Sequence, residues 1–238
     1  MKREDVCSLI KEIGIIPAIR VSSSEDAHFA AEAVASGGIP IVEITMTVAG
    51  AVALISHLVH HHPKMIVGAG TVLDTDTARL CVDAGASFLT APGFDLRILE
   101  FAANENVAVL PGALTPTEVV TAWRTGCNFV KVFPCAQVGG DKYIKALHTA
   151  LPQIPLIAAG GVNQQTAVNF ILSGATAIGV GTELIPTEAI ERRQVHRIRE
   201  LATRFIGFVK EGRERVETAR KQDAAVQKSM EIEKCESR

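Results

Sequence analysis

The segment Asn128-Phe129-Val130-Lys131-Val132-Phe133-Pro134 has the composition of a short apolar β-strand with one lysine at its centre. Because side chains of a strand alternate between its two faces, Phe129, Lys131 and Phe133 are expected to share one face. The ammonium form of Lys131 would be poorly hydrated there, which favours the neutral amine, a nucleophile that can form a Schiff base. The alternative is a structural lysine that pairs with a buried carboxylate or reaches solvent at the end of the strand.

This segment is one of a series of similar runs rich in Val and Ile. The runs cover residues 15–20, 41–45, 65–71, 88–92, 107–112, 129–134, 156–161 and 177–181. Segments with helical periodicity separate them, and these carry start signals such as the capping box Thr115-Pro116-Thr117-Glu118 and stop signals such as Gly126. The alternation predicts an α/β fold, a single closed (β/α)8 TIM barrel. An open doubly wound sheet is the alternative, but its usual glycine-rich first turn is replaced by Ile19-Arg20-Val21-Ser22.

The barrel is predicted to occupy residues 1–209 as one domain, with a short N-terminal helix before the first strand. Residues 186–209 have the pattern of one long helix, and residues 210–238 form a charge-dense tail that is helical or disordered. Two interpretations of this tail stay open: a solvated helix, or an arm that packs on another subunit.

Composition excludes several classes of function. The formal net charge is -2 without a basic cluster before the last helix, so no nucleic-acid partner is expected. No apolar run has the length of a membrane span, and the N-terminus lacks the apolar core of a signal peptide, so we expect a cytoplasmic protein with no membrane partner. The five cysteines are an odd number without a C-x-x-C pair, which indicates neither a disulfide framework nor a zinc site.

Four histidines, His57, His60, His61 and His62, lie at the end of a predicted helix. His57 and His61 have the i, i+4 spacing of metal ligands, but the surrounding segment offers no carboxylate or cysteine to complete a site. We therefore interpret these side chains as groups that complement a helix C-terminus, and predict no metal site.

The ends of the predicted strands carry polar and small residues that are unusual for otherwise apolar strands. They are Arg20, Glu43 with Thr45, Thr71, Pro92, Lys131 with Phe133, Gly160 with Gly161, and Gly181 with Thr182. The carboxyl ends of barrel strands form the active site, so Glu43 and Lys131 are expected to meet there for proton transfer beside an amine. A purely structural ion pair is the alternative, although buried pairs seldom repay their desolvation. Glycines after the last two strands are typical of phosphate binding by backbone amides, or of close packing.

The joint pattern resembles the KDPG/KHG aldolases, class I lyases of 2-keto-3-deoxy-6-phosphogluconate and 4-hydroxy-2-oxoglutarate. The similar motifs are residues 42–45 (VEIT), 67–72 (VGAGTV), 92–93 (PG), 111–112 (PG), 129–134 (FVKVFP), 139–140 (GG), 160–162 (GGV) and 179–181 (GVG). The resemblance covers about residues 8–209 in unbroken order. It implies a homotrimer of metal-free barrels that needs no cofactor and acts on a small keto-acid phosphate.

The resemblance also implies roles for the site residues. Lys131 would form the Schiff base and Glu43 would move protons. The substrate-binding residues would be Thr45, Thr71 and Pro92, the last two in the pyruvate pocket, Phe133 beside the pyruvyl methyl group, and Gly160, Gly161, Gly181 and Thr182 around the 6-phosphate. The expected reaction is cleavage of the phosphogluconate substrate to pyruvate and glyceraldehyde 3-phosphate, and of hydroxy-oxoglutarate to pyruvate and glyoxylate. The alternatives are the corresponding phosphogalactonate aldolase and a non-catalytic trimeric scaffold that binds a phosphorylated metabolite.

Two positions depart from the family pattern. Many members place an arginine, which clamps the substrate carboxylate, where this chain has Thr47. Other members have an arginine at the end of the first strand, and Arg20 is expected to take over the clamp here. Ala159 stands where phosphogluconate-type members often have threonine, which bears on phosphate affinity and on discrimination at C4.

Overall fold

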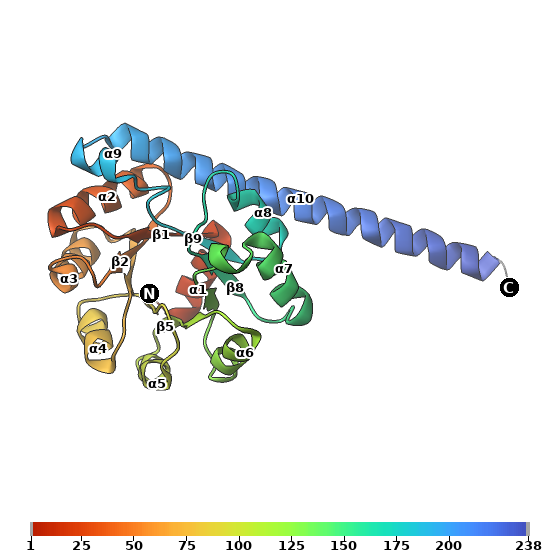
Figure 1. Cartoon of the computed structure of the whole chain (residues 1–238), viewed down its shortest axis with the longest axis horizontal. Coiled ribbons are helices and arrows are strands. Elements are labelled where there is room, and N and C mark those ends of the chain that lie inside the picture. The colour runs from red at the N-terminus through yellow and green to blue at the C-terminus, as the bar shows by residue number, and fades with distance from the viewer. Residues whose placement is uncertain (1, 237–238) are drawn as a thin grey trace.

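The computed structural model describes the backbone of residues 2–236 and the side chains of residues 2–224. Its strands are β1 Ile15–Ile19, β2 Ile41–Thr45, β3 Ile66–Gly70, β4 Phe88–Thr90, β5 Ala108–Leu110, β6 Gly112–Ala113, β7 Val130–Val132, β8 Leu156–Ala159 and β9 Ala177–Val180. Its helices are α1 Arg3–Ile13, α2 Ser24–Ser36, α3 Ala51–His61, α4 Thr75–Asp83, α5 Leu96–Asn104, α6 Pro116–Arg124, α7 Asp141–Ala150, α8 Ala167–Leu172, α9 Thr187–Glu191 and α10 Val195–Glu236, with a 3-10 turn η1 at Ala136–Val138. Figure 1 shows the helices arranged around the central strands.

The strands form one parallel sheet in the order β5-β4-β3-β2-β1-β9-β8-β7-β6. Its two outer strands, β5 and β6, belong to one predicted run and are separated only by Pro111. β5 pairs with β4 and β6 pairs with β7, while the Pro111 carbonyl accepts a 2.9 Å hydrogen bond from the Lys131 amide. The ring is therefore closed, which confirms the predicted (β/α)8 barrel and excludes the open doubly wound sheet.

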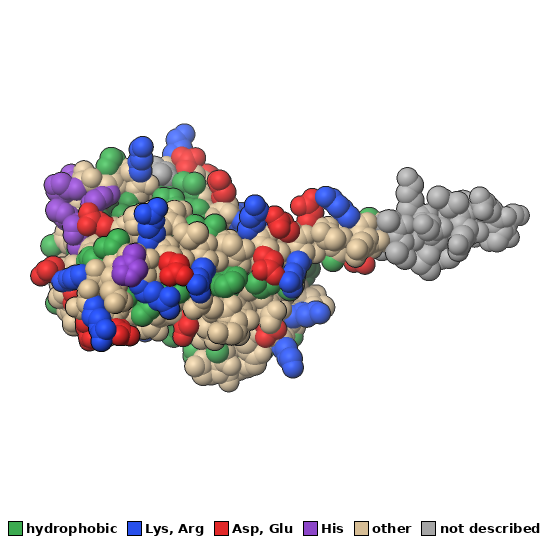
Figure 2. Space-filling model, turned by 90° about the horizontal axis from the view of Figure 1, so that it is seen from above, with side chains coloured by type: hydrophobic (Ala, Val, Ile, Leu, Met, Phe, Trp, Pro, Cys, Tyr) green, Lys and Arg blue, Asp and Glu red, His purple; other side chains and the backbone are tan. Residues whose placement is uncertain are grey.

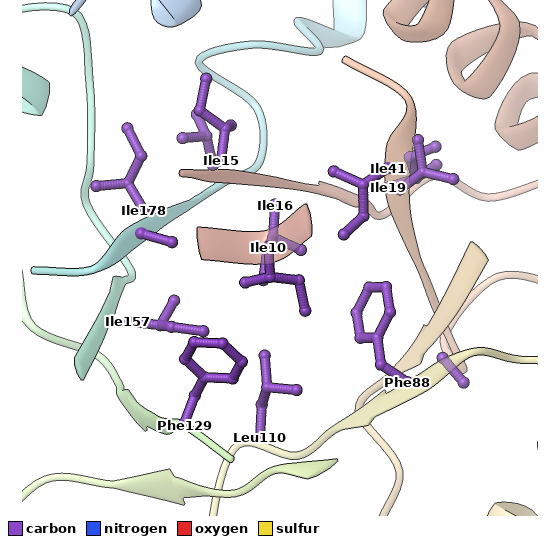
Figure 3. Close-up of a cluster of buried hydrophobic side chains, with 14 of the residues drawn as sticks. Ile10, Ile15, Ile16, Ile19, Ile41, Phe88, Leu110, Phe129, Ile157 and Ile178 are labelled. Atoms are coloured by element: carbon purple, nitrogen blue, oxygen red, sulfur yellow. The ribbon is translucent and has the colours of Figure 1, made fainter. Parts of the chain in front are cut away.

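The barrel interior is packed with branched and aromatic side chains, as parallel strands buried on both faces require. Phe88, Leu110 and Phe129 are fully buried, and Ile10 of α1 lies among them at the centre of the cluster (Figure 3). The predicted short N-terminal helix thus closes one end of the barrel with its apolar side. The other end, where the strands finish, is left for polar side chains.

Local sequence signals set the helix boundaries as expected. The Thr115 hydroxyl accepts from the Glu118 amide, and the Glu118 carboxylate accepts from the Thr115 amide, so the predicted capping box starts α6. Asp95 caps α5 in a similar way, by accepting a hydrogen bond from the Arg97 amide. These bonds satisfy amide groups that a helix start leaves without partners.

The single helix predicted over residues 186–209 is wrong, because the chain breaks between α9 and α10. Arg193 has the left-handed φ of 49°, which interrupts helical geometry. Its guanidinium forms ion pairs with Glu25 at 2.9 Å and Asp26 at 2.8 Å, both on α2. Ion pairs with α2 therefore stabilise the turn between α9 and α10, which local periodicity does not predict.

Helix α10 first packs on the barrel and then leaves it (Figure 1). Ile198, Phe205 and Val209 are buried, and Arg213 donates hydrogen bonds to the Lys11 and Glu12 carbonyls at the end of α1. Residues 217–224 are exposed, and the helix continues to Glu236. The predicted helical extension is confirmed, whereas a domain boundary at 209/210 stays a prediction, since α10 passes through that point without a break.

Three of the five cysteines, Cys81, Cys127 and Cys135, are buried as free thiols, Cys7 is partly buried, and Cys235 lies outside the described side chains. Across the described residues, every helix is too short or too polar to traverse a lipid bilayer.

Candidate active site

Lys131 is the middle residue of β7, and its side chain lines the cavity at the carboxyl end of the barrel. Its neighbours Val130 and Val132 are fully buried on the opposite face, and the lysine side chain is 13% exposed. Its amine is 3.6 Å from Oε2 of Glu43 and 5.7 Å from the ring centroid of Phe133. The predicted shared face of Phe129, Lys131 and Phe133 explains this placement: Phe129 enters the core, and the other two line the mouth.

Glu43 is held on β2, a strand with every residue buried, and its side chain is 4% exposed. Its carboxylate lies against Gly70 of β3, where a Cβ atom would come within 2.1 Å of Oε1. The glycine therefore leaves the volume that the carboxylate occupies. An ionisable pair that is largely shielded from water at the ends of two strands is suited to exchanging protons with a bound molecule.

Thr90 is a site residue that sequence reasoning missed. It ends β4, it is buried, and its Oγ1 accepts a 3.3 Å hydrogen bond from the Lys131 amine. The available signal is a single hydroxyl in the apolar run Phe88-Leu89-Thr90-Ala91-Pro92, two residues before the end of that run and on the same face as Pro92.

A cavity of about 300 Å³ opens over the lysine. The predicted site residues that line it are Arg20, Glu43, Lys131, Phe133, Gly160, Gly161, Gly181 and Thr182, joined by Asn163 and Glu183, which were not predicted. Gly160 and Gly161 both have positive φ, 83° and 89°, and a Cβ on Gly161 would lie 2.2 Å from Ala136. These two positions need glycine, so the loop after β8 presents bare backbone to the cavity.

Arg20 is the cation at the open side of this cavity. It follows β1 directly and is exposed, and its guanidinium forms no ion pair with any carboxylate of the described residues. A free guanidinium can bind a carboxylate or a phosphate through two parallel hydrogen bonds. The cavity thus has an amine and a carboxylate at its base and a cation with bare glycine loops at its rim.

Four other predicted residues lie outside the lining of this cavity. Thr45 is buried, and its hydroxyl donates a 3.0 Å hydrogen bond to the Ile19 carbonyl while lying 2.7 Å from the Thr47 hydroxyl. Thr71 follows β3 with a φ of 60°, and the carbonyl of Pro92 lies against Gly112. The structure therefore places Thr45 and Thr47 where they connect β2 to the end of β1, immediately before Arg20.

A closed parallel barrel with a partly buried lysine and a buried carboxylate facing each other at its mouth defines an enzyme of the class I aldolase type. Residues 6–201 match the family model described as KDPG and KHG aldolase. The 2-dehydro-3-deoxy-phosphogluconate aldolase of Pseudomonas aeruginosa is 33% identical over 208 residues, which cover 86% of this chain and 94% of the relative. The chain belongs to the KDPG and KHG aldolase family and is accordingly a carbon–carbon lyase.

Two solved structures of similar proteins contain small ligands. The KDPG aldolase of Legionella pneumophila, with pyruvate captured as a covalent carbinolamine intermediate, has a TM-score of 0.77 at 29% identity and covers 83% of this chain and 96% of its own. The KDPG aldolase of Zymomonas mobilis with 3-phosphoglycerate has a TM-score of 0.78 at 25% identity and covers 87% of this chain and 97% of its own. A keto acid and a phosphorylated acid are thus bound by proteins of this fold.

Proposed function

We propose that this enzyme cleaves 2-dehydro-3-deoxy-6-phosphogluconate to pyruvate and glyceraldehyde 3-phosphate through a Schiff base on Lys131. The observation that carries the proposal is the 3.6 Å approach of the Lys131 amine to the Glu43 carboxylate at the base of the cavity. The carbinolamine of pyruvate in the Legionella relative supports covalent chemistry at the keto carbon.

The reaction follows from the chemistry of these two groups. The Lys131 amine adds to the C2 ketone, and Glu43 supplies the proton with which the carbinolamine loses water to form the imine. Glu43, then ionised, takes the proton of the C4 hydroxyl as the C3–C4 bond breaks. The bond's electron pair moves into the protonated imine, so the aldehyde leaves and an enamine of pyruvate remains on Lys131. Protonation of the enamine at C3 and hydrolysis of the resulting imine release pyruvate and the free amine.

The remaining lining residues fit the rest of the substrate. Phe133, whose ring lies beside the lysine, would pack on the pyruvyl side, and Arg20 would bind the carboxylate. Backbone amides around Gly160, Gly161, Gly181 and Thr182 would hold the 6-phosphate, which the 3-phosphoglycerate of the Zymomonas relative supports. The unphosphorylated 4-hydroxy-2-oxoglutarate would react with the same Lys131 and Glu43, with Arg20 again binding its carboxylate, to give pyruvate and glyoxylate.

Trapping of the Schiff base is the direct test. The protein is incubated with pyruvate and sodium borohydride, digested, and analysed by mass spectrometry. We expect one reduced pyruvyl adduct on Lys131, its loss in Lys131→Ala, and its retention in the control variant Lys142→Ala, which changes an exposed lysine of α7. An adduct that persists in Lys131→Ala, or maps to Lys142, would overturn the assignment. Absence of any adduct would favour the non-catalytic scaffold.

The substrate itself is identified by comparing turnover of the phosphogluconate substrate, its C4 epimer the phosphogalactonate substrate, and hydroxy-oxoglutarate. We expect the first to have the highest kcat/KM. A higher value for the phosphogalactonate epimer would assign the enzyme to that reaction, and would connect Ala159, which is buried at the end of β8, with the change at C4.

From the family resemblance we also propose that the enzyme is a homotrimer located in the cytoplasm. Leu73, Leu80 and Leu96 are large apolar side chains with 61%, 56% and 46% exposure, consistent with a contact surface around α4. Light scattering of the full chain should give a trimer mass, unchanged when residues 221–238 are deleted. A monomer mass at micromolar concentration would contradict the trimer, and a mass that changes on truncation would make the tail an assembly element.

A further inference from the structure

A second cluster of ligand-type side chains lies outside the catalytic cavity, on the flank of the barrel between α2 and α3. His28 and Glu32 are one turn apart on α2, His57 lies on α3, and His62 follows the end of α3. Figure 2 shows a patch of histidine side chains at the end of the molecule opposite to the extension of α10, with one further histidine visible apart from it. The carboxylate that the neighbouring sequence lacks is thus supplied by Glu32 from another helix.

The three groups His28, Glu32 and His62 have the separation of metal ligands. Oε1 of Glu32 lies 3.6 Å from Nε2 of His62 and 3.9 Å from Nε2 of His28, and one ligand atom from each residue lies within 4.8 Å of the others. In a tetrahedral zinc site with bonds of about 2.0–2.1 Å, ligand atoms are roughly 3.4 Å apart. Small side-chain rotations would therefore bring the three atoms onto one ion.

The histidines of this region differ in whether their ring nitrogens have hydrogen-bond partners. Nδ1 of His60 lies 2.7 Å from the Ser56 carbonyl, and Nδ1 of His61 lies 2.9 Å from the His57 carbonyl, so these two rings complement the end of α3 as predicted. Nε2 of His28, in contrast, is buried without a hydrogen-bond partner among the described residues. A buried nitrogen with an unused lone pair or proton is unfavourable, and coordination of a cation would satisfy it.

An ion-pair network is a weaker explanation of the same residues. Its distances of 3.6 and 3.9 Å exceed those of hydrogen bonds, the Glu32 side chain is 50% exposed, and exposed pairs contribute little. It also leaves Nε2 of His28 unsatisfied. Two imidazoles with one carboxylate suit zinc and similar transition metals, whereas calcium and magnesium prefer oxygen ligands.

We propose that His28, Glu32 and His62 bind one zinc ion that joins α2 to α3. His57, whose ring meets that of His28 edge to face at a centroid distance of 5.1 Å, lies beside this group of three ligands. The site lies outside the cavity around Lys131, so its ion stabilises the barrel wall and takes no part in catalysis. The sequence-based expectation of no metal site does not take this group into account, because its ligands come from α2 and from the residue that follows α3.

Calorimetric titration of chelator-treated protein with zinc chloride tests the proposal, together with thermal unfolding with and without zinc. We expect one zinc per chain and a higher Tm in its presence. Glu32→Gln and His62→Gln should each weaken binding by at least about tenfold and abolish the Tm shift. His60→Gln is the matched control, because its ring is engaged by the Ser56 carbonyl, and it should bind zinc as the parent does.

Two results would overturn the site. The first is no zinc binding by the parent protein at micromolar concentration. The second is unchanged affinity in both Glu32→Gln and His62→Gln, which would place the ion elsewhere. Aldolase turnover should be equal before and after chelator treatment, and a loss of turnover restored by zinc would contradict the structural role. All of these outcomes are independent of the pyruvate trapping that tests the proposed function.

Discussion

The Lys131 amine and the Glu43 carboxylate lie 3.6 Å apart although their strands, β7 and β2, are not neighbours in the sheet. The two side chains therefore meet across the barrel mouth, where Glu43 is buried and Lys131 is partly buried. A buried pair of this kind is weak evidence for stability, because the desolvation of two charges offsets much of their attraction. Its place at the base of a cavity favours proton transfer as the reason for the arrangement.

Glu43→Gln keeps the size of the side chain against Gly70 and removes its ability to exchange protons. We expect turnover of the phosphogluconate substrate to fall by about a hundredfold or more, the usual scale of general acid–base catalysis. A coupled assay of pyruvate release measures the effect, with circular dichroism to check the fold. Nearly unchanged turnover would make Glu43 a structural partner of Lys131.

Thr90→Val removes the hydroxyl that accepts a hydrogen bond from the Lys131 amine, with little change in shape. Hydrogen bonds to charged groups contribute about 1.5–3 kcal/mol, so we expect kcat/KM to fall by roughly tenfold or more. Thr45→Val is the matched control, because the Thr45 hydroxyl donates to the Ile19 carbonyl and not to Lys131. We expect this variant to lower Tm and to change kcat/KM less than Thr90→Val does. Unchanged turnover in Thr90→Val would reduce Thr90 to a packing residue.

Much of the barrel could be predicted because its strands repeat the same local pattern of apolar residues, turn and helix. The split of the fifth run at Pro111 could not, because a run does not reveal that its two halves pair with different neighbours. The turn at Arg193 was missed for a related reason. Its partners Glu25 and Asp26 lie on α2, far away in the sequence.

In the candidate site too, local sequence patterns identify some residues, whereas others are recognisable only from the tertiary structure. Lys131 and Glu43 are recognisable as charges in apolar strands, and the strand-end rule brings them to one mouth. Thr90 ends β4 but lies two residues before the end of the apolar run 88–92, and a threonine in a strand is common, so the pattern alone does not mark it as a site residue. The pairing of Glu32 with His62 needs the relative position of two helices, which residue spacing does not contain.

The buried cysteines give a prediction that depends on pH. Burial raises the pKa of the Cys81 and Cys135 thiols to about 11 and that of Cys127 to about 12. At pH 8 these thiols are neutral, and only the thiolate reacts, so iodoacetamide should leave them unlabelled in the native protein and label them in urea. Rapid native labelling of Cys135, detected by peptide mass spectrometry, would contradict its burial.

The same shifts affect stability at high pH. An unfolded thiol loses its proton near pH 8.5, whereas the folded chain retains these protons to about pH 11. The unfolded state therefore binds fewer protons in this range, and the free energy of unfolding should fall as pH rises from about 9 to 11. Urea denaturation at pH 7, 9 and 10.5 measures this decline, and Cys135→Ala should make it shallower.

Arg20→Met tests the carboxylate clamp. Arg20 lines the cavity of Lys131, and its guanidinium has no carboxylate partner among the described residues. Thr47, at the family's other clamp position, is exposed and lies beside the Thr45 hydroxyl. Methionine retains the apolar stem but loses the two parallel hydrogen bonds that a guanidinium makes to a carboxylate. Binding of pyruvate and of its keto-acid parents should weaken by about 1.5–3 kcal/mol.

The two substrates separate a carboxylate clamp from a phosphate contact. Hydroxy-oxoglutarate carries the keto-acid carboxylate without a phosphate, so its kcat/KM should fall in Arg20→Met by about the same factor as that of the phosphogluconate substrate. Arg20→Lys keeps the charge but cannot form both hydrogen bonds, and should recover only part of the loss. A loss confined to the phosphorylated substrate would show that Arg20 binds the phosphate, and would leave the carboxylate to Thr47 or to backbone amides of the cavity.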